Sequence, residues 1–120
     1  MRTGDDIPHS QPDQTLDQVL VEMSSKGMGF TVVVDHASAV RGVFTDGDLR
    51  RTLDNNTPFR DTAVSRAMTA HCCTVTPQTL AAEALRVMET RSINALPVVD
   101  DSGKLCGALN MHDLLRAGVA

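Results

Sequence analysis

Apolar side chains recur with the spacing of an amphipathic helix at two places along the chain. The first set stands at positions i, i+3, i+4 and i+7: Leu16, Val19, Leu20 and Met23. The second set has the same spacing: Ala81, Ala84, Leu85 and Met88. Thr15 and Thr79 stand where an N-cap hydroxyl would satisfy free amides of the first turn. We therefore predict two helices, each with one apolar face.

Each predicted helix is followed by a pair of short strands. The runs 31–34 and 96–99 are apolar, largely β-branched and closed by an aspartate, which is typical of buried strands. Turn-forming residues follow at 35–38 and 100–103. A second strand, 40–44 or 105–109, then leads directly into a helix opened by Thr45 or Asn110.

The two halves of this pattern align with each other at an offset of 65 residues, with 1–55 on 66–120 and ten identical positions. A single two-stranded ribbon cannot bury both of its faces, so we expect the halves to pack on each other about a pseudo-twofold axis. The predicted fold class is α+β, made of two βαββα-type repeats. We place the repeats at 1–57 and 66–120, joined by a polar connector at 58–65.

Composition and charge narrow the functional classes. The chain has 120 residues, 42% of them hydrophobic and 22% charged, and no apolar run approaches the ~20 residues of a membrane-spanning helix. A net charge of −4 makes duplex nucleic acid an unfavourable partner. The amino-terminal residues lack the layout of a signal peptide, so we expect a cytoplasmic setting without membrane association.

The sequence offers no nucleophile with a base and an orienting partner at informative spacing, so we predict no catalytic residues and no enzymatic activity for this stretch. His71, Cys72 and Cys73 are adjacent, but no C-x-x-C pair is present. Neighbouring side chains of an extended segment point to opposite faces. We therefore interpret the cysteines as buried thiols and predict no metal site.

The strand-to-helix junctions carry the most specific chemistry. Thr45 and Asp48 stand three residues apart, as do Asn110 and Asp113. A carboxylate at this place can accept hydrogen bonds from both hydroxyls of a ribose, and the start of a helix favours an anion. The same Thr-x-x-Asp spacing is also a capping box, in which each side chain satisfies the other residue's amide. Both interpretations stay open at this point.

The doubled motif resembles a pair of cystathionine-β-synthase-type (CBS) repeats. The residues that carry the resemblance are Gly-Val-Phe-Thr-Asp-Gly-Asp-Leu at 42–49 and Gly-Ala-Leu-Asn-Met-His-Asp-Leu at 107–114. More finely, the strings at 3–8, 44–51 and 111–118 are similar to the carboxy-terminal region of bacterial D-arabinose 5-phosphate isomerases. The resemblance implies a CBS-pair module that serves a sugar-isomerase domain of the same parent chain in the synthesis of Kdo, a lipopolysaccharide sugar.

The resemblance also implies a site and an effector. Thr45 and Asn110 are expected at a phosphate, and Asp48 and Asp113 at a ribose. The candidate ligand-binding residues are Thr31, Thr45, Asp46, Asp48, Arg50, Arg51, Asn94, Ala95, Pro97, Asn110, His112 and Asp113. The implied effector is a nucleotide or sugar nucleotide such as CMP-Kdo, AMP or ATP, with no catalytic cofactor.

The alternative is a structural module that assembles homo-oligomers and uses the motifs only as caps. In either case we expect a homo-oligomer.

Overall fold

A computed structural model describes residues 2–79 and 81–116, and the chain divides into two compact units. The first unit comprises Pro8–Cys72. The second unit comprises Met1–Ile7 together with Cys73–Ala120, so the beginning of the chain belongs with its second half.

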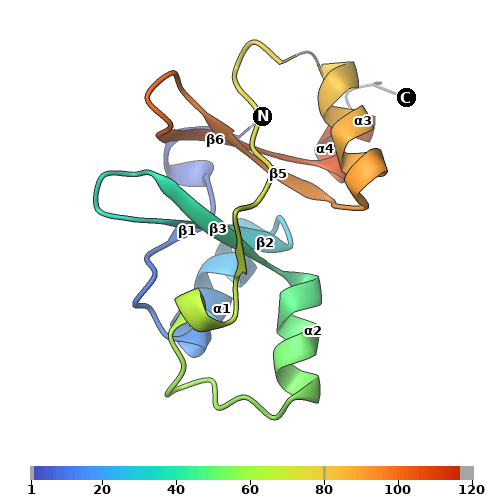
Figure 1. The fold of residues 1–120 in the computed structure, drawn as a ribbon. Coiled ribbons are helices and arrows are strands. Elements are labelled where there is room, and N and C mark those ends of the chain that lie inside the picture. The colour runs from blue at the N-terminus through green and yellow to red at the C-terminus, as the bar shows by residue number, and fades with distance from the viewer. Residues whose placement is uncertain (1, 80, 117–120) are drawn as a thin grey trace. The chain divides into compact units, whose positions relative to one another are not determined.

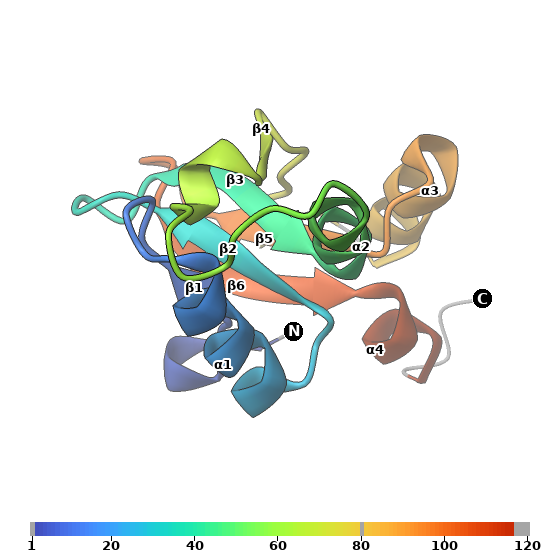
Figure 2. The same cartoon turned by 90° about the horizontal axis from the view of Figure 1, so that it is seen from below.

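The first unit contains a four-stranded sheet with the order β1-β2-β3-β4 (Figure 1). Strand β1 (His9–Ser10) is parallel to β2 (Phe30–Val34), while β3 (Val40–Thr45) is antiparallel to both β2 and β4 (Thr69–Ala70). Helix α1 (Leu16–Lys26) lies alongside β1 and β2, as Figure 2 shows, and α2 (Asp46–Asp54) continues directly from β3. A short 3₁₀ helix, η2 (Val64–Arg66), precedes β4.

The core of the first unit forms where the apolar face of α1 meets the sheet. Its fully or nearly buried members are Leu16, Val19, Met23, Val33, Phe44 and Val64. Leu20 packs against this cluster with part of its surface exposed. The predicted apolar face of the first helix is therefore confirmed.

The second unit repeats the order helix, strand, strand, helix, and its sheet has two strands. Helix α3 (Ala81–Arg91) is followed by the antiparallel pair β5 (Ala95–Val99) and β6 (Leu105–Asn110), and then by α4 (Met111–Arg116). The 3₁₀ helix η1 (Gly4–Asp6) comes from the beginning of the chain. The core cluster of the second unit is made of Val75, Ala84, Met88, Leu96, Val98 and Leu114. The predicted face of this helix is confirmed at Ala84, Leu85 and Met88 but is wrong at Ala81, which is exposed on the first turn.

The bounds of α3, β5 and β6 equal those of α1, β2 and β3 plus 65 (16 + 65 = 81, 30 + 65 = 95, 40 + 65 = 105). An irregularity in strand pairing also recurs, between Val33 and Val34 and again between Val98 and Val99. The predicted α+β fold with two equivalent repeats is confirmed at the level of single residues.

The aspartates that close the first strand of each pair form the turns. Asp35 Oδ1 accepts hydrogen bonds from the amides of Ala37 and Ala39, at 2.9 and 3.1 Å. In the second unit, Asp100 Oδ1 accepts from the amides of Ser102 and Lys104, at 2.8 and 3.0 Å. The same carboxylate-centred turn thus joins the two strands of both repeats.

The compact units follow boundaries different from those of the sequence repeats. Arg2 and Ala108 exchange two backbone hydrogen bonds, of 3.0 and 3.1 Å, which attach the beginning of the chain to β6. Strand β4, from the second sequence repeat, instead pairs with β3. We call residues 2–7 and 69–70, which precede the first helix of each repeat, the leading segments. Each leading segment therefore pairs with the sheet that is formed mainly by the other repeat. Part of the expected connector at 58–65 also belongs to a core, because Val64 is fully buried there.

The two predicted helix caps differ in outcome. Thr15 is the N-cap of α1, and its amide donates to Gln18 Oε1 at 3.0 Å. The Thr79 hydroxyl accepts instead from the Thr76 amide at 3.2 Å, within the turn that precedes α3. Within residues 2–79 and 81–116, no helix has both the length and the apolar character needed to cross a membrane.

Candidate functional site

The first motif forms a closed hydrogen-bonding network around Asp48. Thr45 is the N-cap of α2, and its hydroxyl accepts from the Asp48 amide at 3.2 Å. In return, the Asp48 carboxylate accepts from the amide and hydroxyl of Thr45, at 3.0 and 3.2 Å. It also accepts from the Thr69 hydroxyl at 3.0 Å and from the Arg51 guanidinium. The Asp48 side chain is only 3% exposed, so this network stabilises the start of α2 and leaves little of the carboxylate open to a ligand.

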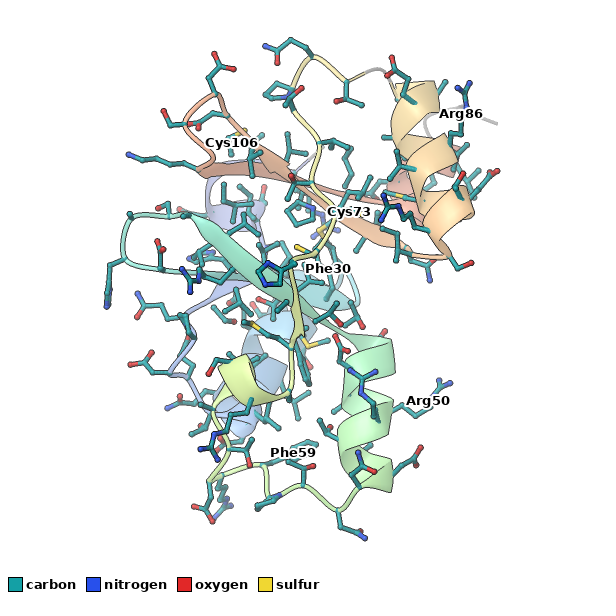
Figure 3. The ribbon with its side chains drawn as sticks, viewed as in Figure 1. Phe30, Arg50, Phe59, Cys73, Arg86 and Cys106 are labelled. Atoms are coloured by element: carbon teal, nitrogen blue, oxygen red, sulfur yellow. The ribbon has the colours of Figure 1, made fainter. Side chains whose placement is uncertain are left out.

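The other polar candidates of α2 face solvent. Asp46 is exposed, and its amide donates to the Gly29 carbonyl at 3.1 Å. Arg50 is exposed and extends away from α2 in Figure 3. Arg51 is exposed too, but its guanidinium is held against Asp48. Arg50 is therefore the arginine of this helix whose charge remains available to an anion.

Thr31 lies inside the first unit. Its side chain is fully buried in β2, and its hydroxyl is 3.0 Å from the hydroxyl of Ser10 in β1. This bond satisfies both buried hydroxyl groups and links the two parallel strands. Thr31 as a ligand contact stays a prediction, and the structure shows it in a packing role.

The carboxylate of the second motif is more exposed and has fewer hydrogen bonds than that of the first. Asn110 Oδ1 accepts from the Asp113 amide at 2.7 Å, so this half of the capping arrangement is formed. Among the hydrogen bonds of the described residues, the Asn110 amide does not donate back to the Asp113 carboxylate. Asp113 Oδ2 lies 3.9 Å from Arg2 Nε, and its side chain is 25% exposed. Asp113 can therefore accept hydrogen bonds from a ligand without giving up a complete cap.

The remaining candidates of the second unit surround this motif in sequence. His112 is exposed on the first turn of α4. Asn94 is exposed, and its carbonyl accepts from the Met111 amide at 2.9 Å, which joins the start of β5 to the start of α4. Ala95 is half-buried, and Pro97 is buried within β5, where its carbonyl accepts from the Val75 amide at 3.0 Å. The structure thus places Asn94, Asn110 and His112 near one strand-to-helix junction.

Sequence reasoning missed two residues of these networks, Thr69 and Arg2. Both stand on leading segments and reach the aspartate of the unit that they join. No local spacing could have found them, because Thr69 is 21 residues from Asp48 and Arg2 lies at the opposite end of the chain from Asp113. In the sequence, these segments stand out only because the two repeats have no identical residues there.

The cysteines and a surface hollow stand apart from the motifs. Cys72, Cys73 and Cys106 are only partly buried, so their interpretation as buried thiols is wrong. Partial burial, and secondarily the charge of Asp100, raise the pKa of the Cys106 thiol above its ordinary value, which disfavours the thiolate needed for metal binding. Across residues 2–79 and 81–116, no group of three or more metal-ligating side chains is gathered. A polar hollow of about 550 Å³ in the first unit is lined by His9, Ser10, Gln11, Asp13, Gln14 and Gln18, which include none of the candidate residues.

The CBS domain model matches residues 1–55 and again 64–120. The chain belongs to the CBS domain family. Its two CBS repeats are 49% identical over 119 residues to the arabinose 5-phosphate isomerase KdsD of Pseudomonas aeruginosa, and 44% identical to the corresponding protein of Salmonella typhimurium. In each case the match covers 99% of this chain and 36% of the relative, so the chain spans about a third of the length of these isomerases.

The CBS repeats are also similar to a solved structure. CBSX2, a CBS-pair protein from Arabidopsis thaliana, was crystallised in complex with AMP. The similarity has a TM-score of 0.83 at 26% identity and covers 99% of this chain and 92% of CBSX2. The resemblance of the sequence to a CBS pair is therefore confirmed, both by the family match and by the fold.

Proposed function

We propose that this CBS pair is the regulatory, ligand-sensing part of an arabinose 5-phosphate isomerase and that its ligand is a nucleotide or sugar nucleotide. The remainder of the parent chain would carry out the aldose–ketose isomerisation in Kdo synthesis. Similarity to isomerases over 99% of this chain supports the parentage, and similarity to an AMP complex supports an adenine nucleotide as the first ligand to test. CMP-Kdo is the second candidate, as a product of the pathway that the parent would serve.

The observation that carries the proposal is the open carboxylate of Asp113. It is eight times as exposed as that of Asp48 (25% against 3%) and lies beside an arginine, an asparagine and a histidine. A carboxylate can accept from both hydroxyls of a ribose, and a charge-assisted hydrogen bond contributes roughly 1.5–3 kcal/mol. The second motif is thus better suited to bind a ligand than the first.

Titration calorimetry and thermal unfolding of the 120-residue chain test this proposal. AMP, ATP, CMP and CMP-Kdo are titrated into the unmodified chain, into Asp113→Ala and into Asp101→Ala, a control that removes an exposed carboxylate from the turn between β5 and β6. A ligand at a hundredfold excess over its Kd stabilises the folded state by about 2.7 kcal/mol. We expect AMP to bind and Asp113→Ala to weaken binding at least tenfold, with Asp101→Ala unchanged. Absence of binding by all four ligands would contradict the sensing role.

A structural role in oligomerisation is the second candidate. The closed network around Asp48 favours it, because this motif works as a helix cap. Two apolar side chains on the helices of the first unit are also largely exposed, Val21 at 71% and Leu53 at 59%. This role predicts concentration-dependent assembly that is insensitive to nucleotide and is reduced by Leu53→Glu, as measured by analytical ultracentrifugation.

A further inference from the structure

Arg2 and Thr69 occupy the same place at the edges of the two sheets. Arg2 lies opposite Ala108 of β6, and Thr69 lies opposite Val43 of β3. Val43 and Ala108 are equivalent at the repeat offset of 65 (43 + 65 = 108). The leading segment of each repeat therefore presents one residue at the same register position, although the alignment by sequence pairs Arg2 with Ala67 instead.

Both residues reach the motif aspartate of the unit that they join. The Thr69 hydroxyl donates to Asp48 at 3.0 Å, whereas Arg2 Nε lies 3.9 Å from Asp113. In the first unit, the cation beside the carboxylate comes from the same helix, as Arg51. In the second unit, the cation is carried by the leading segment, so the charge of the motif depends on that segment being attached.

The leading segment, residues 2–7, meets the second sheet beside the motif. This attachment includes one bridge to β6, with two backbone hydrogen bonds between Arg2 and Ala108. The ion pair is long, and its side chains are 34% and 25% exposed, so by itself it contributes little. A ligand that contacts both Arg2 and Asp113 would add its interactions to those of the attached segment and so favour the attached state.

We propose that Arg2 couples ligand binding at Asp113 to the attachment of residues 2–7 to β6. This inference rests on the proposed function and concerns the regulation of the same motif. The hydroxyls of a ribose would donate to the Asp113 carboxylate, whose two oxygens can accept further bonds while Arg2 stays close. The phosphate of the same nucleotide would accept from the Arg2 guanidinium. A ligand held by both residues tightens the segment, and an attached segment raises ligand affinity by the same factor.

Amide hydrogen exchange at Ala108, followed by NMR on the 120-residue chain, reports the attachment, because this amide donates to the Arg2 carbonyl at 3.1 Å. With saturating AMP we expect exchange at Ala108 to slow about tenfold in the unmodified chain, within the usual range of coupling between sites. In Arg2→Ala, AMP should no longer slow this exchange, and AMP affinity should fall about five- to tenfold. Arg2→Lys should restore part of both effects, because it keeps the charge.

Arg41→Ala is the matched control, since Arg41 forms an ion pair of similar length, 4.0 Å, with Asp35 of the turn between β2 and β3. It should change neither AMP affinity nor exchange at Ala108. If AMP binds Arg2→Ala as tightly as it binds the unmodified chain, or leaves exchange at Ala108 unaltered, the coupling is wrong while nucleotide binding stands. If AMP, ATP, CMP and CMP-Kdo all fail to bind the unmodified chain, the proposed function fails, and the coupling fails with it.

Discussion

Asp48 and Asp113 hold the same place in two copies of one motif, yet their surroundings differ. Asp48 accepts from Thr45, Arg51 and Thr69 and is nearly buried. Asp113 is partly exposed and faces Arg2 across 3.9 Å. The difference begins with two substitutions between the copies: Asn110 in place of Thr45, and Arg2 in place of Thr69.

Replacing each aspartate by alanine should separate stability from binding. Asp48→Ala removes a cap and leaves the Thr45 amide and Thr69 hydroxyl without their acceptor, so we expect a loss of about 2–3 kcal/mol in the free energy of unfolding. Asp113→Ala should cost under about 1 kcal/mol, because its carboxylate is exposed and its ion pair is long. Urea unfolding monitored by circular dichroism measures both. Equal losses would show that the two motifs have the same structural role.

The alkylation rate of the Cys106 thiol should report on packing in the second unit. Its pKa is raised by burial and by Asp100, so less thiolate is present at any pH around neutrality. In a Cys72→Ser/Cys73→Ser variant, we expect iodoacetamide to modify Cys106 at pH 8 at least tenfold more slowly than it modifies glutathione. The rate should rise with pH beyond the ordinary range of a thiol. Modification as fast as that of glutathione would contradict a raised pKa of the partly buried Cys106.

At the level of elements, the contact between β3 and β4 depends on a residue without a side chain. A Cβ added at Gly42 would lie 2.5 Å from the Thr69 carbonyl oxygen and 3.0 Å from Met68 Sδ. Neither strand could keep its position with such a contact. Gly42 is therefore required for β4, which carries Thr69 toward Asp48.

Gly42→Ala should destabilise the first unit by about 1–3 kcal/mol, the usual cost of forcing extra atoms into a packed site. Gly47→Ala is the control, because a Cβ there would meet only the Thr45 hydroxyl at 3.6 Å, an ordinary contact. In the first turn of α2, that change should stabilise by about 0.5–1 kcal/mol. Thermal unfolding of both variants measures the difference. A neutral Gly42→Ala would show that β4 does not need close approach to β3.

The helices and strands themselves were well predicted. Apolar residues at i, i+3, i+4 and i+7 identified α1 and α3, and β-branched runs identified β2 and β5 to within one residue. The predicted βαββα repeats include a strand before each first helix, but no residues were assigned to β1 or β4. Each of these strands is two residues long and has no repeating pattern of its own. Their extended conformation results from pairing with a longer strand.

At the scale of the whole molecule, the leading segments decide where the chain can be divided. A fragment of residues 8–72 retains β1 to β4 and the buried Val64. A fragment of residues 1–57, which follows the sequence repeat, lacks both β4 and Val64.

We therefore expect fragment 8–72 to be more stable than fragment 1–57. Losing Val64 alone should cost about 1.5–3 kcal/mol of apolar burial, a large share of the stability of so short a chain. The two fragments are compared by the dispersion of amide resonances in ¹H–¹⁵N correlation spectra and by their urea unfolding midpoints. Equal dispersion and midpoints would mean that β4 and Val64 add little to this fold.

The sequence by itself determined the repeated strand-to-helix motif, the order of helices and strands, the buried face of the first helix and the kinship with CBS pairs. The motif, the element order and the buried face follow from periodicity and from local hydrogen bonding, which act over a few residues. The relation to CBS pairs was indicated by the resemblance of the strings at 42–49 and 107–114. Only the tertiary structure decided which aspartate is enclosed by hydrogen bonds and which has an exposed carboxylate. That difference comes from Thr69 and Arg2, which lie far along the chain from Asp48 and Asp113 and reach them through pairing at the sheet edges.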